Sequence, residues 1–137
     1  METQKPLQTP IHLGLIGCGS IVRNAHAPSY QALGDLVKVA AVADPFASSR
    51  DQIAATLGVP SAQCYADYRD MLTQAPIDVV TVATPHHLHV EHVVQAAQAG
   101  KAIISEKPMA TNMAEADAIR EAVLRHHVPY AIVHNLL

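Results

Sequence analysis

Short runs of apolar, mainly β-branched residues alternate with longer segments of helical periodicity along the chain. The runs are nearly continuous, without regular polar positions, which is typical of strands buried on both faces of a sheet. We predict six strands, at residues 11–16, 36–43, around Cys64, 77–83, 102–105 and 130–133. Because helical segments separate these strands, the fold class is α/β. The prediction is a Rossmann, doubly wound, mainly parallel six-stranded sheet with helices on both faces.

The helices are predicted between the strands, at residues 20–33, 45–57, 67–74, 87–99 and 112–126. Gly58 and Gly100 follow the second and the fourth of these helices, where a residue without a side chain suits the turn that ends a helix. Asp67 and Asn112 precede the third and the fifth, where a side-chain oxygen can accept from a free N–H group. Glu115 lies three residues after Asn112 and would complete a capping box.

The composition supports a single globular domain and excludes several other classes of protein. A chain of 137 residues has the usual length of one domain, and we expect a tail at residues 1–9 and the domain at residues 10–137. Half of the residues are hydrophobic and 15% are charged, which excludes a disordered chain. With a net charge of −3 and no dense basic run, we expect no binding to nucleic acid.

The cellular location is predicted from what the sequence lacks. Two cysteines, Cys18 and Cys64, are too few for a disulfide-stapled secreted scaffold. Residues 1–10 have no apolar core of the kind found in a signal peptide. No apolar run approaches the ~18 residues that a membrane span needs. We therefore expect a cytoplasmic protein without a membrane partner.

A glycine-rich turn, Gly17-Cys18-Gly19, directly follows the first predicted strand and opens the first predicted helix. Gly17 permits the tight turn, and Gly19 lets a pyrophosphate approach the backbone. The N–H groups of Ser20 and Ile21 would then face phosphate oxygens at a helix N-terminus, where the helix dipole favours an anion. We therefore predict that these five residues bind a dinucleotide.

An acidic residue, Asp44, ends the second strand at about the spacing expected for a carboxylate that binds the adenosine ribose. Such a carboxylate accepts a hydrogen bond from the 2′-hydroxyl and repels a 2′-phosphate. Arg50 lies within the next helix and not beside Asp44, so NAD is favoured over NADP. Val22 departs from the glycine or alanine that is usual at the third position of the motif, which suggests slightly wider spacing between helix and strand.

A purely structural interpretation of these residues remains open. Gly17 and Gly19 would then only form a tight turn, and Asp44 would only cap the next helix. The combination of the preceding strand, the following helix and the acidic residue favours dinucleotide binding over this alternative.

Five stretches of the sequence resemble the Gfo/Idh/MocA family, the group of glucose–fructose oxidoreductase and inositol dehydrogenase. They are GLIGCGSI at 14–21, ADP at 43–45, ATPHHLH at 83–89, AGK at 99–101 and EKPMA at 106–110. The resemblance implies hydride transfer between NAD or NADP and a hydroxyl carbon of a sugar or cyclitol. It also implies a second, α/β substrate domain, which we expect to be absent from this chain.

The resemblance assigns roles to residues outside the glycine-rich turn. Lys107 stands at the position of a lysine that lies near the nicotinamide and assists catalysis, and its peptide bond with Pro108 is expected to be cis. Glu106 stands where the family has a contact with the cofactor ribose. Four residues stand in the loop that passes the two halves of the cofactor: Thr84, Pro85, His87 and His89.

Two other functions remain open at this stage. Without a substrate domain, the chain could be a non-catalytic module that binds a dinucleotide. It could also be one chain of a split enzyme, with a partner chain supplying the substrate domain.

The histidines also raise the question of a metal site. His86, His87, His89 and His92 lie close together in the sequence, and His89 and His92 could share one face of a helix. A zinc site usually takes three or four ligands, often including cysteine or carboxylate, and Cys64 is distant in sequence. We therefore predict no metal site.

Overall fold

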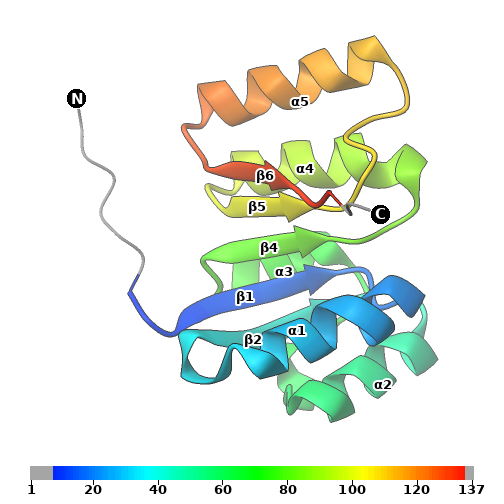
Figure 1. Ribbon diagram of the computed structural model, residues 1–137, viewed down its shortest axis with the longest axis vertical. Helices are drawn as coiled ribbons and strands as arrows, with labels where there is room; N and C mark the ends of the chain where they lie inside the picture. Colours follow the sequence, from blue (N-terminus) through cyan, green and yellow to red (C-terminus); the bar gives the residue numbers. More distant parts are fainter. Residues whose placement is uncertain (1–7, 135–137) are drawn as a thin grey trace.

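The computed structural model describes residues 8–134. Most of the tail predicted at residues 1–9, and the last three residues of the predicted domain, lie outside the described residues. Six parallel strands form one sheet in the order β3-β2-β1-β4-β5-β6. The predicted Rossmann, doubly wound class is confirmed (Figure 1). The strands are β1 Ile11–Ile16, β2 Val37–Ala43, β3 Cys64–Tyr65, β4 Val79–Val82, β5 Ala102–Ser105 and β6 Tyr130–Ile132.

Helices cover both faces of this sheet. They are α1 Ala27–Ala32, α2 Ala47–Leu57, α3 Tyr68–Gln74, α4 His89–Gln98 and α5 Met113–Arg125. Buried residues of β1 and β2 pack with Val22 and with Ile53 of α2 in one apolar cluster. Met71 of α3, Val93 of α4 and Ile119 of α5 belong to a second cluster. The sheet is therefore buried between two cores, as the continuous apolar strands predict.

The helical segment predicted at residues 20–33 is not a uniform α-helix. Residues Val22–His26 form a π-helix, in which the N–H of Ala27 donates to the carbonyl of Val22. Pro28 explains this change, because its ring has no N–H and would clash with the carbonyl four residues earlier in an α-helix. A short 3₁₀-helix, Gly34–Leu36, then leads into β2.

The predicted helix caps are found in the structure. Asp67 accepts from the N–H of Arg69 at 2.9 Å, and Asn112 accepts from the N–H of Glu115 at 2.9 Å. The Glu115 carboxylate accepts from Thr111 and not from Asn112, so the reciprocal half of the capping box is shifted by one residue. Gly58 ends α2 in the left-handed conformation.

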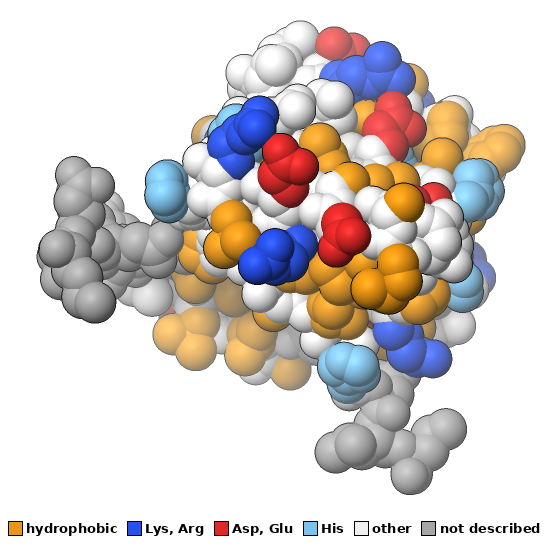
Figure 2. All heavy atoms as spheres, turned by 90° about the horizontal axis from the view of Figure 1, so that it is seen from above, with side chains coloured by type: hydrophobic (Ala, Val, Ile, Leu, Met, Phe, Trp, Pro, Cys, Tyr) orange, Lys and Arg blue, Asp and Glu red, His pale blue; other side chains and the backbone are white. Residues whose placement is uncertain are grey.

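One end of the molecule is formed by α5 and β6, and Figure 2 shows it from outside. Acidic and basic side chains are interspersed there among hydrophobic ones, without a large patch of one sign. Met113 and Leu124 of α5 are exposed apolar residues. Within residues 8–134, no helix has the length and apolar character to cross a bilayer.

The turn after β1 is crowded at Gly17, which has a φ of 101°. A Cβ atom at this position would lie 2.5 Å from the main-chain oxygen of Ala83, which follows β4. Gly58 also has a positive φ, of 70°, but a Cβ there would meet open space. A side chain at Gly17 would therefore cause both backbone strain and a steric clash, whereas a side chain at Gly58 would cause backbone strain alone.

We predict that Gly17→Ala destabilises the chain by more than ~2 kcal/mol, because strain and a backbone clash add. Gly58→Ala is the matched control and should cost only about 1 kcal/mol, from the backbone conformation alone. Urea unfolding monitored by circular dichroism measures both. Equal losses for the two variants would contradict the role of the contact with Ala83.

Candidate functional site

A cavity of about 680 Å³ lies at the carboxyl ends of β1, β2 and β4. This is the edge at which open α/β sheets bind ligands, and the volume lies in the range of ligand pockets. Seven of the residues predicted from sequence line it: Gly17, Gly19, Ser20, Ile21, Asp44, Thr84 and Pro85. Five others do not line it: Cys18, His87, His89, Glu106 and Lys107.

The glycine-rich turn gives the cavity an open floor. A Cβ atom on Gly19 would have no heavy atom within 4 Å, so the backbone there is accessible. The helix begins at Ser20, and both Ser20 and Ile21 are exposed. A helix N-terminus next to accessible backbone is a suitable place for an anion.

Asp44 holds the glycine-rich turn against the end of β2. Its Oδ2 accepts from the N–H of Cys18 at 2.8 Å, and its Oδ1 accepts from the N–H of Phe46 at 2.8 Å. Each carboxylate oxygen has a second lone pair, so both can still accept from a ligand. The N-cap of α2 is Phe46 and not Asp44. The alternative that Asp44 only caps this helix therefore does not account for its hydrogen bond with the glycine-rich turn.

The cavity also has a wall of side chains that the sequence analysis did not assign to a site. Tyr68 donates to Glu91 at 2.9 Å, and its ring packs edge-on against His92 with centroids 4.4 Å apart. Arg69 pairs with Asp67 and Glu91 at 3.5 and 3.8 Å. These residues follow β3 or lie in α4. The rule that ligands bind beyond strand ends could have singled out the turn after β3, but not Glu91 or His92.

An exposed phenylalanine, Phe46, lies at the edge of the same cavity. It is 71% exposed and is the single phenylalanine of the chain. It follows Asp44 by two residues, so it lies on the side where the predicted ribose-binding carboxylate ends β2. Its position shortly after the second strand is the sequence signal from which Phe46 could have been predicted as a site residue.

His92 is buried and bonded to the loop after β4. Its Nδ1 lies 2.8 Å from Thr84 Oγ1. Burial lowers the pKa of His92 from 6.5 to about 4, and the nearby His89 and Arg69 add to this, while Glu91 opposes it. His92 is therefore neutral in the folded protein at neutral pH.

We predict that this histidine makes the folded state less stable in mild acid. His92 has a pKa of 6.5 in the unfolded chain and of about 4 in the folded chain, so between these pH values only the unfolded chain binds the proton. The free energy of unfolding therefore falls as the pH is lowered from 6.5 to about 4. The loss attributable to His92 is at most ~3 kcal/mol. Urea titrations between pH 7 and 4 measure it. His92→Asn should flatten this dependence, and His126→Gln, at an exposed histidine, should not.

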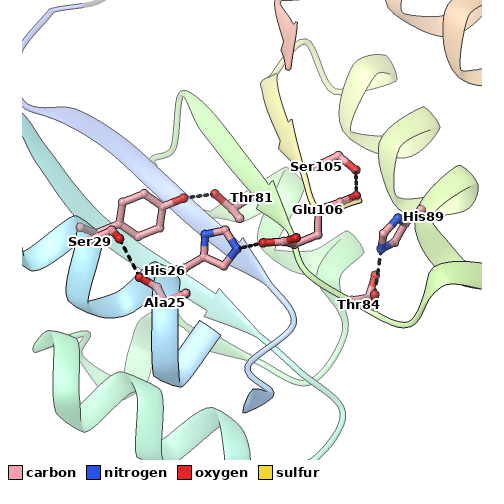
Figure 3. A network of polar contacts seen from close by, with 9 residues as sticks. Ala25, His26, Ser29, Thr81, Thr84, His89, Ser105 and Glu106 are labelled. Atoms are coloured by element: carbon pink, nitrogen blue, oxygen red, sulfur yellow. Dashed lines mark hydrogen bonds and ion pairs between the residues drawn. The ribbon is translucent and has the colours of Figure 1, made fainter. Parts of the chain in front are cut away.

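A second cluster of polar side chains lies between β4, β5 and the helix that follows β1 (Figure 3). His26 Nε2 meets Glu106 Oε1 at 2.5 Å, and both side chains are almost fully buried. Tyr30 and Thr81 share a hydrogen bond of 2.6 Å beside them, and the rings of His26 and Tyr30 stack. Burial raises the pKa of Tyr30, so its hydroxyl keeps its proton. Glu106 is among the site residues predicted from the sequence, whereas His26 is not.

Lys107 is exposed and directly follows Glu106 at the end of β5. Its peptide bond with Pro108 is cis, as the family resemblance implies. His87 is exposed in the short 3₁₀-helix His86–Leu88, which precedes α4. His89 is fully buried, and its two ring nitrogens lie 2.8 Å from the carbonyl oxygens of Pro108 and Thr84.

The histidines do not gather around a common point. Among residues 8–134, no group of three or more His, Cys, Asp or Glu side chains is arranged to hold a metal ion. His89 and His92 are instead bonded within the protein. The ring nitrogens of His89 face two carbonyl oxygens, and Nδ1 of His92 meets the hydroxyl of Thr84.

Cys18 is buried inside the turn and does not line the cavity. Its Sγ is 3.9 Å from the carbonyl of Ala43. Burial raises the pKa of the Cys18 thiol to about 12, and the neighbouring Asp44 carboxylate adds to this. The Cys18 side chain is therefore an unreactive thiol that packs in the core, and its main-chain N–H donates to Asp44.

We predict that a thiol reagent such as dithionitrobenzoate labels Cys64 first, because Cys64 is only half-buried and Cys18 is 1% exposed. In a Cys64→Ser variant, labelling of Cys18 should proceed only as fast as the chain unfolds. Absorbance at pH 8 follows the reaction, and added urea should accelerate it. Rapid labelling of Cys18 in the folded chain would contradict its burial.

The chain is similar to one family of proteins along almost its whole length. Residues 11–134 match the GFO_IDH_MocA family, described as an oxidoreductase family with an NAD-binding Rossmann fold. Levoglucosan dehydrogenase of Pseudarthrobacter phenanthrenivorans is 33% identical over 91% of this chain and 33% of its own. The rhizopine catabolism protein MocA of Rhizobium meliloti is 34% identical over 88% of this chain and 36% of its own.

Solved structures agree with the sequence relatives. The WlbA dehydrogenase of Bordetella pertussis, in complex with NADH and UDP-GlcNAcA, superposes with a TM-score of 0.84 at 31% identity. The match covers 90% of this chain and 36% of that one. The chain therefore spans about a third of the length of the curated relatives it matches.

Proposed function

Because the chain belongs to the Gfo/Idh/MocA oxidoreductase family, whose members have an NAD-binding Rossmann fold, we propose that it binds NAD in the cavity at the sheet edge. The pyrophosphate would lie on Gly17, Gly19 and the N–H groups of Ser20 and Ile21. The observation that carries this proposal is the accessible backbone of Gly19 beside a carboxylate, Asp44, that is held 2.8 Å from the N–H of Cys18.

The preference for NAD over NADP follows from charge around Asp44. A carboxylate accepts from the ribose 2′-hydroxyl and repels a 2′-phosphate. The structure corrects one premise taken from the sequence: Arg50 does lie beside Asp44, and it donates to the main-chain oxygen of Asp44 at 2.7 Å. Arg69 pairs with Asp67 and Glu91. Both guanidinium groups near the cavity therefore already have partners, which supports the choice of NAD.

The remaining predicted residues are proposed to serve the nicotinamide half of the cofactor. Thr84 and Pro85 line the cavity, and His87 stands in the same loop. Glu106 keeps one carboxylate oxygen, Oε2, free to accept from the nicotinamide ribose, while Oε1 is bonded to His26. His89 contributes through the loops that its ring joins, since it is fully buried.

In the whole protein, we propose that this domain serves a dehydrogenase acting on a hydroxyl carbon of a sugar or cyclitol. NAD supplies the hydride acceptor for such an oxidation. Lys107, with its exposed amine at the end of β5, would take and pass on the hydroxyl proton at Nζ. A substrate domain would complete the site, either in a longer chain or in a partner chain. The free thiols Cys18 and Cys64 support a cytoplasmic location.

We expect calorimetry on the purified chain to give an affinity for NADH at least tenfold tighter than for NADPH, a difference of about 1.4 kcal/mol. Asp44→Asn should remove this difference, because the amide no longer repels a 2′-phosphate. Gly19→Val should weaken both ligands by tenfold or more while the chain stays folded, because the new side chain fills open space.

Asp117→Asn, on the exposed face of α5, is the control and should bind as the wild type does. Equal or tighter binding of NADPH by the wild type would overturn the role of Asp44. Binding of neither ligand would overturn the proposed function of this chain.

A further inference from the structure

The segment Glu106-Lys107-Pro108 is held from both sides by histidines that come from opposite faces of the sheet. His26, at the end of the π-helix after β1, meets the Glu106 carboxylate at 2.5 Å. His89, the first residue of α4, meets the main-chain oxygen of Pro108 at 2.8 Å. Figure 3 shows the two rings on either side of Glu106. Lys107 stands between the two held residues, and its own side chain is exposed.

The surroundings of His89 determine how many protons its ring carries. Nδ1 faces the oxygen of Pro108 and Nε2 faces the oxygen of Thr84, each at 2.8 Å. A carbonyl oxygen only accepts, whereas a neutral imidazole has one N–H group and one bare nitrogen. A neutral ring would place a bare nitrogen against an oxygen lone pair. Both contacts are satisfied as hydrogen bonds only when both ring nitrogens carry a proton.

A charge at this position is compatible with its surroundings. His89 is fully buried, so its charge needs strong partners, and hydrogen bonds from a charged donor are stronger than neutral ones. The ring of His86 lies edge-on at 5.7 Å. The neighbouring His92, whose pKa is lowered to about 4 by burial, is neutral and places no second positive charge beside this ring.

The π-helix gives His26 its place opposite Glu106. The wider turn at Val22–His26 ends at this buried residue, and π-helical turns are frequent at functional sites. His26 Nε2 faces a carboxylate oxygen, so this nitrogen donates. The ring is packed against Tyr30, with centroids 6.0 Å apart, and Tyr30 is itself bonded to Thr81 of β4.

We propose that His26 and His89 are positioning residues that fix the Lys107 segment at the nicotinamide end of the site, and that His89 does so as a buried imidazolium. This inference rests on the proposed function, because it places residues 106–108 beside the nicotinamide. His26 sets the orientation of the Glu106 carboxylate. His89 ties the main-chain carbonyl of Pro108, one residue after Lys107, to the loop of Thr84, so the two loops move as one unit.

The first test measures the protonation of His89 directly. In the ¹⁵N-labelled chain at pH ~7.5, where an exposed histidine is mostly neutral, long-range ¹H–¹⁵N correlation separates imidazolium from neutral rings. We expect both ring nitrogens of His89 to show the shift of a protonated nitrogen, with the signal assigned by its loss in His89→Gln. One protonated and one bare nitrogen would overturn the imidazolium.

The second test separates positioning from general stability by comparing NADH with ADP, which lacks both the nicotinamide and its ribose. The chain contains no tryptophan, so NADH fluorescence reports its binding directly, and calorimetry reports the binding of ADP. His26→Leu and His89→Leu should each weaken NADH about tenfold and leave ADP unchanged. His26→Gln, which restores an N–H donor, should recover most of the affinity. His126→Gln, at an exposed histidine at the end of α5, is the control.

The outcomes distinguish the two proposals. Equal weakening of both ligands, or no weakening, would overturn the positioning role and leave the proposed function standing. If the wild type binds neither ligand, the proposed function fails and the cofactor-side role fails with it, while the protonation of His89 is still decided by the first test. If a Leu variant does not fold, the corresponding Asn variant replaces it and is judged by the same ratio of affinities.

Discussion

The close approach of the turn after β1 to the end of β4 is the contact on which the whole site depends. Only a residue without a side chain fits at Gly17, where a Cβ would lie 2.5 Å from the oxygen of Ala83. This approach is possible because β1 and β4 are parallel neighbours whose carboxyl ends lie at the same edge. Asp44 then joins the turn to β2 through the N–H of Cys18. The two contacts bring three strand ends around one cavity.

The site is built so that its polar groups hold one another. Thr84 is tied to His92 by its hydroxyl and to His89 by its carbonyl, and His89 in turn reaches Pro108. On the other face, His26 joins the helix after β1 to Glu106. The groups at this edge therefore lie in a connected framework, with the glycine-rich turn at one end and Lys107 at the other. Such a framework orders a site before a ligand arrives.

Local signals predicted some elements well and others only in part. The turn at Gly17, the caps at Asp67 and Asn112, and the six parallel strands were predictable, because each depends on residues close in sequence or on a repeated apolar pattern. The π-helix was not predicted, although Pro28 supplies its physical reason. The pairing of His26 with Glu106 joins residues 80 positions apart, and no periodicity carries information over that distance.

The sequence by itself determined the fold class, the glycine-rich turn and the acidic residue after β2, because backbone geometry and hydrophobic periodicity are local properties. Only the tertiary structure decided which polar side chains lie together. It showed that Asp44 is bonded to the turn, that His92 and Tyr68 form a wall of the cavity, and that both ring nitrogens of His89 face carbonyls. Burial and hydrogen-bond partners set the protonation of a histidine, and both arise only when distant segments pack together.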